Sequence, residues 1–203
     1  MLVVTSLVVA PDAPTFNLRL DAGELRVIRA SHPELGRGLA LLRRPAGGQI
    51  MFEGQDLMRL GEGALRKTRR RLQYVGGDPR KALLPRQTAA QALSEPLLIH
   101  KIGRADDVRG RIEAAATALA IPIAALDREI TALSAVLRWR LLIARSLALT
   151  PTLLIVDSPR AHLSAALIDG LRESSAAARG ESALLWLDAL VDHGADESQV
   201  GAG

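Results

Sequence analysis

The amino-acid sequence predicts an α/β protein with a mainly parallel sheet flanked by helices. Residues 153–157, LLIVD, form an uninterrupted apolar run that ends in an acid. Such a run is typical of a strand buried on both faces of a parallel sheet. Residues 137–149 before it carry apolar residues at helical spacing, and Ser134 stands where a helix N-cap is expected. Further short apolar runs predict strands at 25–28, 72–75 and 183–187.

Length and composition favour one globular domain. The chain has 203 residues, of which 48% are hydrophobic and 24% charged, as in ordinary globular proteins. It contains no cysteine, which excludes disulfides, a thiolate nucleophile and Cys-ligated metals. No run approaches the roughly 18 apolar residues of a spanning helix, and the N-terminus predicts a strand, not a signal peptide. The net charge of +4 indicates a solvated basic face or an acidic protein partner, and nucleic acid is the less favoured partner.

The N-terminal part predicts an antiparallel β layer. Residues 2–9 are β-branched and apolar, and residues 16–20 alternate as an edge strand does. Residues 21–24, DAGE, predict a turn, and residues 51–57 predict a hairpin. Helices are predicted at 36–44, 64–71, 106–120 and 165–178.

Several motifs resemble the ATP-binding domain of ABC transporters. Residues 133–137, LSAVL, stand where the family has its LSGGQ signature, and the following helix and strand end at Asp157, as in the Walker B motif. Residues 52–57, FEGQDL, are similar to the family's F-x-G-x-D-L hairpin. Residues 84–86, LPR, and 92–100, ALSEPLLIH, resemble the oligopeptide and dipeptide importer branch. The resemblance implies a P-loop NTPase-like fold with a helical insertion.

The same resemblance implies the division of the chain. The core would comprise residues 1–86 and 133–193, and a helical subdomain would occupy about 87–132. Together they would form a single domain over 1–203, with a flexible tail at 194–203.

The phosphate-binding loop of the family is missing. Its Gly-rich turn exposes backbone N–H groups to phosphates, and its Lys neutralises their charge. Residues 29–36, RASHPELG, contain no Gly-x-x-x-x-Gly-Lys. Pro33 lacks an N–H group, and Glu34 places an anion where phosphates would lie. His32 is nearest to the lost Lys, but a neutral imidazole is a poor replacement.

The other catalytic positions of the family are also replaced. The signature glycines are Ala135 and Val136, and a β-branched Val should block close backbone approach. The catalytic Glu is Ser158, which cannot polarise water as a carboxylate does. The remaining replacements are Gly77 for the metal-contacting Gln, Ser164 for the loop Asp, Ala10 for the adenine-stacking aromatic, and Asp188 or Ala189 for the switch His, with His193 too far along.

These losses together predict a chain with no catalytic residue and no bound cofactor. Ser134 and Asp157 remain as vestigial nucleotide-binding positions, and Asp157 as a vestigial metal ligand. Each has a simpler interpretation, Ser134 as a plain N-cap and Asp157 as a strand-end acid. ATP and Mg²⁺ would bind only if residual affinity persists. Trp139 and Trp186 are predicted to lie in the core.

A docking stretch is predicted where the family receives a helix of its membrane subunits. Its candidate residues are Gly77, Asp78, Leu83, Leu84 and Arg86. The two leucines would form an apolar floor, and Arg86 with Arg80 a polar rim. In the alternative interpretation, the leucines pack inward and the arginines are solvated.

The favoured function is therefore a degenerate, non-hydrolytic cassette subunit of a peptide-type ABC importer. The resemblance implies an intact ATPase subunit and membrane subunits as partners, and a cytoplasmic position on the inner face of the cytoplasmic membrane. Three alternatives stay open: a residual ATPase that borrows catalytic groups from its partner, a free-standing interaction protein, and a basic nucleic-acid-associated protein. An intact ATPase and membrane subunits that co-purify with the chain would favour the importer subunit. Salt-dependent binding to DNA would favour the nucleic-acid-associated protein.

Overall fold

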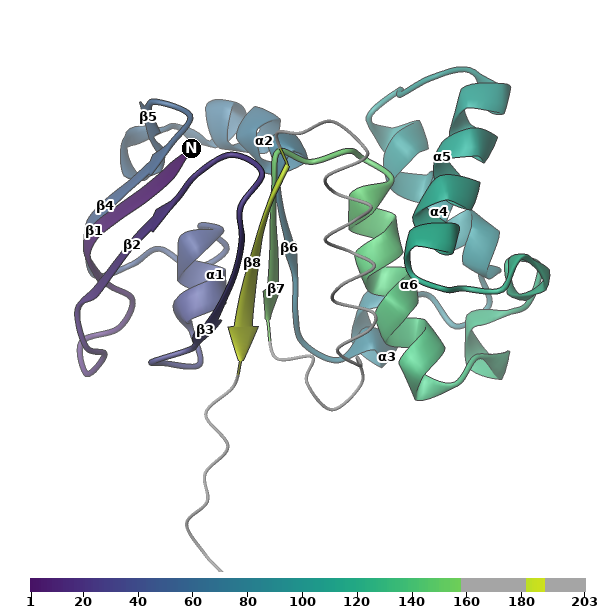
Figure 1. Cartoon of the computed structure of the whole chain (residues 1–203), viewed down its shortest axis with the longest axis horizontal. Coiled ribbons are helices and arrows are strands. Elements are labelled where there is room, and N and C mark those ends of the chain that lie inside the picture. Colours follow the sequence, from purple (N-terminus) through teal and green to yellow (C-terminus); the bar gives the residue numbers. More distant parts are fainter. Residues whose placement is uncertain (158–181, 189–203) are drawn as a thin grey trace, which may run out of the picture.

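Two four-stranded sheets and a group of helices make up the computed structural model, which describes residues 1–157 and 182–188 (Figure 1). The first sheet is antiparallel and the second is parallel. The predicted α/β class with an N-terminal antiparallel layer is confirmed. The predicted tail, the helix at 165–178 and the positions Ser158, Ser164, Ala189 and His193 lie outside the described residues.

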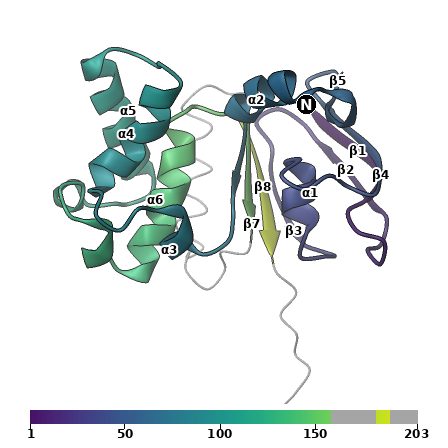
Figure 2. The same cartoon turned by 180° about the vertical axis from the view of Figure 1, so that it is seen from behind.

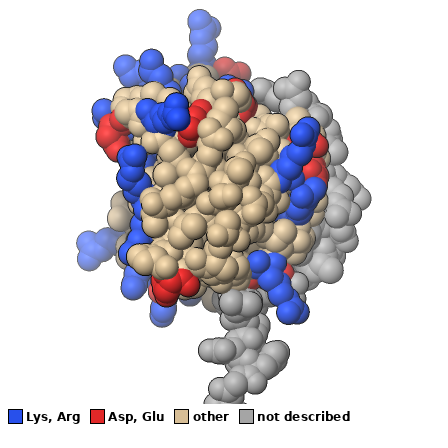
Figure 3. All heavy atoms as spheres, turned by 90° about the vertical axis from the view of Figure 1, so that its left-hand side faces the viewer, with Lys and Arg blue, Asp and Glu red and all other residues tan. Residues whose placement is uncertain are grey.

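The antiparallel sheet has the strand order β2-β1-β4-β5. Its strands are β1 (Leu2–Val8), β2 (Phe16–Leu20), β4 (Gly47–Phe52) and β5 (Gln55–Asp56). Leu2 lies between Leu20 and Phe52 in the pairing register, and all three side chains are buried. The outer face is largely free of charged side chains, with Lys and Arg gathered around its rim (Figure 3).

The parallel sheet has the strand order β3-β8-β7-β6. Its strands are β3 (Leu25–Arg29), β6 (Leu72–Val75), β7 (Leu153–Asp157) and β8 (Ala183–Asp188). Every residue of β7 and β8 is buried, because both strands are internal and both of their faces are covered. The carboxyl ends of β7 and β8 therefore bring Asp157 and Asp188 to one edge of the sheet.

The helices lie on both sides of this sheet. They are α1 (Leu35–Leu39), α2 (Glu62–Arg71), α3 (Pro79–Ala82), α4 (Ala89–Ile99), α5 (Ala105–Ala118) and α6 (Ala135–Leu147). Short 3₁₀ turns occur at Leu57–Arg59, Ile123–Ala125 and Ile130–Ala132. Seen from behind, α4, α5 and α6 stand on the side of the parallel sheet opposite to the antiparallel sheet (Figure 2).

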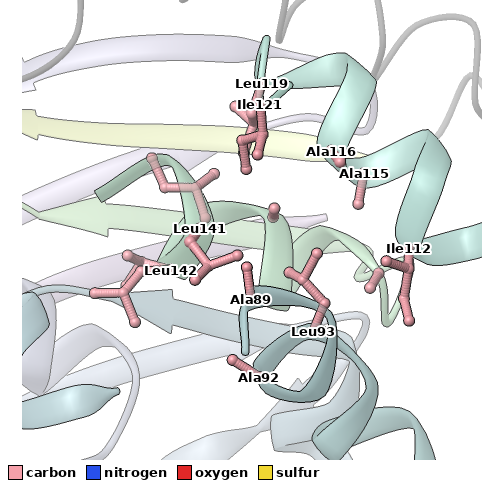
Figure 4. Packing of buried hydrophobic residues seen from close by; sticks show 14 of the residues in the cluster. Ala89, Ala92, Leu93, Ile112, Ala115, Ala116, Leu119, Ile121, Leu141 and Leu142 are labelled. Carbon is pink, nitrogen blue, oxygen red and sulfur yellow. The ribbon is translucent and has the colours of Figure 1, made fainter. Parts of the chain in front are cut away.

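The hydrophobic core has two parts. One fills the space between the two sheets, around residues such as Leu39, Phe52 and Ile155. The other joins the helical group to the parallel sheet (Figure 4), where Leu93 of α4 and Ile112 of α5 pack in one cluster with Leu141 of α6. Trp139 and Trp186 belong to this second part, so the prediction that both tryptophans are core residues is confirmed.

The first helix is much shorter than predicted. The sequence predicts a helix over 36–44, but α1 ends at Leu39. Gly36 and Gly38 weaken helix formation. Leu41 adopts a left-handed conformation with φ of 48°, which cannot continue a helix. The prediction of a long helix was therefore wrong at its second half.

The lengths of the helices show whether any of them could cross a membrane. None of the described helices combines the length and hydropathy that a bilayer span requires.

Candidate nucleotide site and docking stretch

Asp157 ends the central strand β7 and accepts a hydrogen bond from a side chain of the neighbouring strand β6. The Tyr74 hydroxyl on β6 donates a hydrogen bond to Asp157 Oδ2 over 2.9 Å. Asp157 is 8% exposed. The burial of Tyr74, followed by the charge of Asp157, raises the pKa of the Tyr74 hydroxyl well above its ordinary value. The hydroxyl thus stays protonated and donates to the Asp157 carboxylate.

The α1 segment lies directly against this pair. A Cβ atom added to Gly36 would lie 2.5 Å from Asp157 Oδ2 and 2.9 Å from Tyr74 Cε2. A Cβ added to Gly76 would lie 2.3 Å from the Tyr74 hydroxyl. Two glycine backbones and one phenol ring thus pack closely against Asp157.

The loop between β3 and α1 uses its own donors internally. The Ala30 N–H donates to the Asp188 carbonyl over 2.8 Å, and the Leu35 N–H donates to the His32 carbonyl over 3.0 Å. The Glu34 N–H donates to His32 Nδ1 over 3.1 Å, and Pro33 has no N–H. The N–H groups of Ala30, Glu34 and Leu35 are thus all engaged within the chain.

Glu34 adds a negative charge at the same place. Its Oε2 atom lies 3.4 Å from Arg43 Nη1 and 4.0 Å from Arg37 Nε. Both arginines thus lie near the carboxylate of Glu34. In the described ranges, no three His, Asp or Glu side chains gather as metal ligands.

At the signature position, Ser134 caps α6. Its hydroxyl accepts a hydrogen bond from the Leu137 N–H over 3.2 Å. This is the N-cap role predicted from sequence, and it stabilises the start of the helix. Val136 lies beside it and is 38% exposed, so a branched side chain stands at the surface where the family has glycine.

The predicted docking stretch follows β6. Gly77 has φ of 84°, a conformation that favours glycine, and the space around it is open. Asp78 caps α3 by accepting from the Arg80 N–H over 2.9 Å. The side-chain hydrogen bond from Arg80 also lowers the pKa of Asp78. The Asp-Pro pair thus starts a short helix that the sequence pattern did not predict.

The two leucines of this stretch differ. Leu83 is 3% exposed and belongs to the core, whereas Leu84 is 57% exposed. The expectation that Leu83 helps to form a docking floor needs correction, because its side chain packs inward. Arg86 is exposed and makes no ion pair in the part of the chain that the structure describes.

A hollow of about 350 Å³ lies beside this stretch, between β6, α3, α4 and α6. None of the five predicted docking residues lines it. Its wall includes Ile99, which with Leu98 ends α4 as an exposed apolar pair. Sequence reasoning missed this pair. Buried Leu93 and Leu97 mark the inner face of α4, and residues 98 and 99 fall outside their spacing.

The hydrogen bond between Tyr74 and Asp157 gives a first testable result. Tyr74 is the only tyrosine, so its titration can be followed alone by tyrosinate absorbance at high pH. Because folding raises its pKa, its contribution to stability is complete below pH about 10 and falls as pH rises further. We expect the difference in unfolding free energy between wild type and Tyr74→Phe, about 1–3 kcal/mol near neutrality, to shrink above that pH. A constant difference would contradict the buried hydrogen bond.

Comparison with known proteins defines the class. The family model described as ABC transporter matches residues 35–161, more than half of the chain. The chain therefore belongs to the ABC transporter family.

Its relatives include peptide-import proteins. The chain is 36% identical over 125 residues to a putative peptide import ATP-binding protein from Brucella ovis, covering 62% of this chain and 39% of the relative. It is 33% identical over 157 residues to the dipeptide transport ATP-binding protein DppF of Escherichia coli, covering 75% of this chain and 46% of the relative. The chain thus spans less than half the length of these relatives.

Solved structures show the same fold. The structure of cbiO1 from Clostridium perfringens, described as part of the ABC transporter complex cbiONQ, has a TM-score of 0.78 at 20% identity and covers 93% of this chain and 78% of its own. A dimeric ATP-binding cassette in a post-hydrolysis state with ADP and Pi has a TM-score of 0.75 at 18% identity, covering 93% and 88%. These confirm the predicted ABC ATP-binding fold.

Proposed function

We propose that this chain is a non-hydrolytic cassette subunit of a peptide-type ABC importer. It would pair with an intact ATP-binding subunit and dock onto the membrane subunits. The observation that carries the proposal is the close packing at Asp157, where the Tyr74 hydroxyl and the Gly36 backbone occupy the space beside Oδ2. The importer type rests on the similarity to peptide-import proteins.

The structural frame supports a role that depends on shape. The parallel sheet, the helical group and the Ser134 cap are all formed, although the phosphate loop uses its donors internally. A cassette of this kind would offer its partner a dimer surface and would offer the membrane subunits a groove. Hydrolysis would then occur only at the site whose phosphate loop belongs to the partner.

The assembly is tested by purifying the tagged native chain from its own cell. We expect an intact cassette subunit and two membrane subunits in the same complex. The partner's catalytic Glu is then replaced with Gln, and phosphate release is measured. Loss of all turnover is expected. Persistent turnover would support the residual ATPase, and purification of the chain alone would support the free-standing protein.

The isolated chain is expected to show no ATP-specific binding. The phosphate loop lacks its Lys, and the N–H groups of Ala30, Glu34 and Leu35 are engaged. Isothermal titration with Mg-ATP should show no saturable binding that is tighter than that of tripolyphosphate, with an intact cassette as the positive control. A micromolar dissociation constant for Mg-ATP that tripolyphosphate does not match would overturn the proposal.

Restoring the catalytic carboxylate alone should not restore activity. Ser158→Glu supplies a base, but the phosphate loop and Gly77 remain unable to place nucleotide, metal and water. Phosphate release in the presence of the intact partner should stay at the level of the unmodified complex. A clear gain of turnover from this single change would mean that only the base had been lost.

A further inference from the structure

A basic pocket lies at the opposite edge of the parallel sheet from Asp157. Helix α2 runs along the edge where β7 and β8 begin (Figures 1 and 2), and the Thr152 N–H donates to the Arg71 carbonyl over 2.8 Å. The pocket has a volume of about 670 Å³, and no Asp or Glu within residues 1–157 and 182–188 lines it. Its polar lining residues are Arg66, Lys67, Arg70, Arg71, His100, Thr150, Thr152 and Ser182.

Three of the four Lys and Arg side chains in the basic pocket have no acidic partner among the described residues. Arg71 pairs with Glu53, Nη2 to Oε1, over 2.6 Å. Arg66, Lys67 and Arg70 make no ion pair within residues 1–157 and 182–188, and all three are exposed. Positive charge therefore accumulates at the pocket without compensation from the described protein.

The cations in the middle of the helix do not stabilise it. Arg66 and Arg70, and likewise Lys67 and Arg71, are four residues apart and lie on one helical face. Like charges at this spacing weaken a helix. The helix dipole favours the cations of the last turn but not Arg66 and Lys67, which lie in the middle of α2. A bound anion would offset the repulsion along the whole face.

The opposite wall of the pocket supplies hydroxyl groups. Thr152 Oγ1 accepts a hydrogen bond from Arg71 Nε over 3.3 Å, so its own proton can be donated elsewhere. Thr150 and Ser182 also line the pocket, but the Ser182 hydroxyl donates to the Pro151 carbonyl over 2.9 Å, so the two threonines are the hydroxyl donors. An anion in the pocket would thus meet guanidinium and ammonium groups on one side and hydroxyl groups on the other.

The shape and lining favour a small ligand over a nucleic acid. The volume falls in the range of small-molecule pockets, about 300–1,000 Å³. Among the described residues, His100 is the only aromatic side chain that lines the pocket, so no Phe, Tyr or Trp there offers a large platform for stacking bases. We propose that the basic pocket binds a small molecule that carries two or more phosphate groups. This inference does not depend on the proposed transporter role.

Sodium pyrophosphate is the probe for the test. Isothermal titration of the full chain at low and at physiological salt should show one saturable site, and pyrophosphate should raise the melting temperature. Arg66→Gln with Arg70→Gln should weaken binding about 10-fold or more, because charged hydrogen bonds are lost. The melting temperature without ligand should not fall, since the double change also removes a repulsive pair.

The matched control removes the same charge elsewhere. Arg59→Gln with Arg109→Gln changes two exposed arginines that lie outside the pocket. Binding in this control should stay within about 2-fold of wild type if only screened long-range charge is lost. Equal weakening in both variants, or no saturable binding, would overturn the proposal. If a DNA duplex displaces pyrophosphate when DNA phosphate is present at a lower concentration than pyrophosphate, the surface binds nucleic acid instead.

The same variants keep this test separate from the nucleotide test. Mg-ATP could enter the basic pocket through its triphosphate. Such binding should disappear in Arg66→Gln with Arg70→Gln and should be matched by tripolyphosphate. ATP-specific binding that persists in the variant would contradict the transporter proposal and leave the basic pocket unaffected.

Discussion

Replacing Leu83 with Asp is expected to cost about 3–5 kcal/mol of folding free energy, enough to unfold a marginally stable domain. Leu83 is 3% exposed and packs in the cluster that joins the helical group to the parallel sheet. A carboxylate there would be buried without a cation or hydrogen-bond donors. Urea unfolding followed by tryptophan fluorescence is suitable, because both tryptophans lie in the same cluster.

The adjacent residue is the matched control for this change. Leu84 is 57% exposed, so Leu84→Asp should change stability by only about 0.5 kcal/mol. If the stretch receives the membrane subunits, the same change should abolish their pull-down, because it places a charge in an apolar contact. Arg86→Asp tests the rim in the same assay.

The pair of measurements separates folding from docking. Loss of assembly with an unchanged melting temperature identifies a docking residue. Normal folding and normal assembly of both Leu84→Asp and Arg86→Asp would contradict the docking hypothesis and favour a free-standing protein. Full stability of Leu83→Asp would contradict its burial.

The central frame of the fold could be predicted because its signals are local. The run LLIVD at 153–157 predicted a strand covered on both faces, and all five residues are buried. The spacing of residues 137–149 and the cap at Ser134 predicted α6 within two residues at each end. The DAGE turn at 21–24 is observed, with Gly23 at φ of 73°. Periodicity and turn chemistry were sufficient for these elements.

The environment of Asp157 could not be predicted. Tyr74 and Asp157 are 83 residues apart in sequence, and they meet only because β6 and β7 pair in parallel. The sequence motif identifies Asp157 but not Tyr74, which donates a hydrogen bond to it. The same limit applies to Leu83 and Leu84, whose inward and outward directions follow from where α3 ends.

The short α1 has a tertiary origin that the sequence pattern hides. Glycine at position 36 weakens a helix, yet any larger residue would meet the carboxylate of Asp157. The sequence therefore shows the local cost of Gly36 but not the close packing that requires it. This packing is the basis of a second large effect.

Gly36→Ala is expected to destabilise the protein by about 1–3 kcal/mol, the usual cost of overpacking. The new Cβ would lie 2.5 Å from Asp157 Oδ2 and 3.0 Å from Asp157 Cγ. Either α1 or the carboxylate must move, and movement of the carboxylate would stretch its hydrogen bond to Tyr74. Thermal unfolding, combined with the alkaline titration of Tyr74, distinguishes the two responses.

Gly110→Ala is the matched control, because an added Cβ meets nothing within 4 Å in the middle of α5. This change should stabilise the chain by about 0.5–1 kcal/mol, since Ala is the better helix former. If Gly36→Ala behaved like Gly110→Ala, α1 would not lie against the carboxylate. The space beside Asp157 would then be open, and the observation that carries the non-hydrolytic role would be lost.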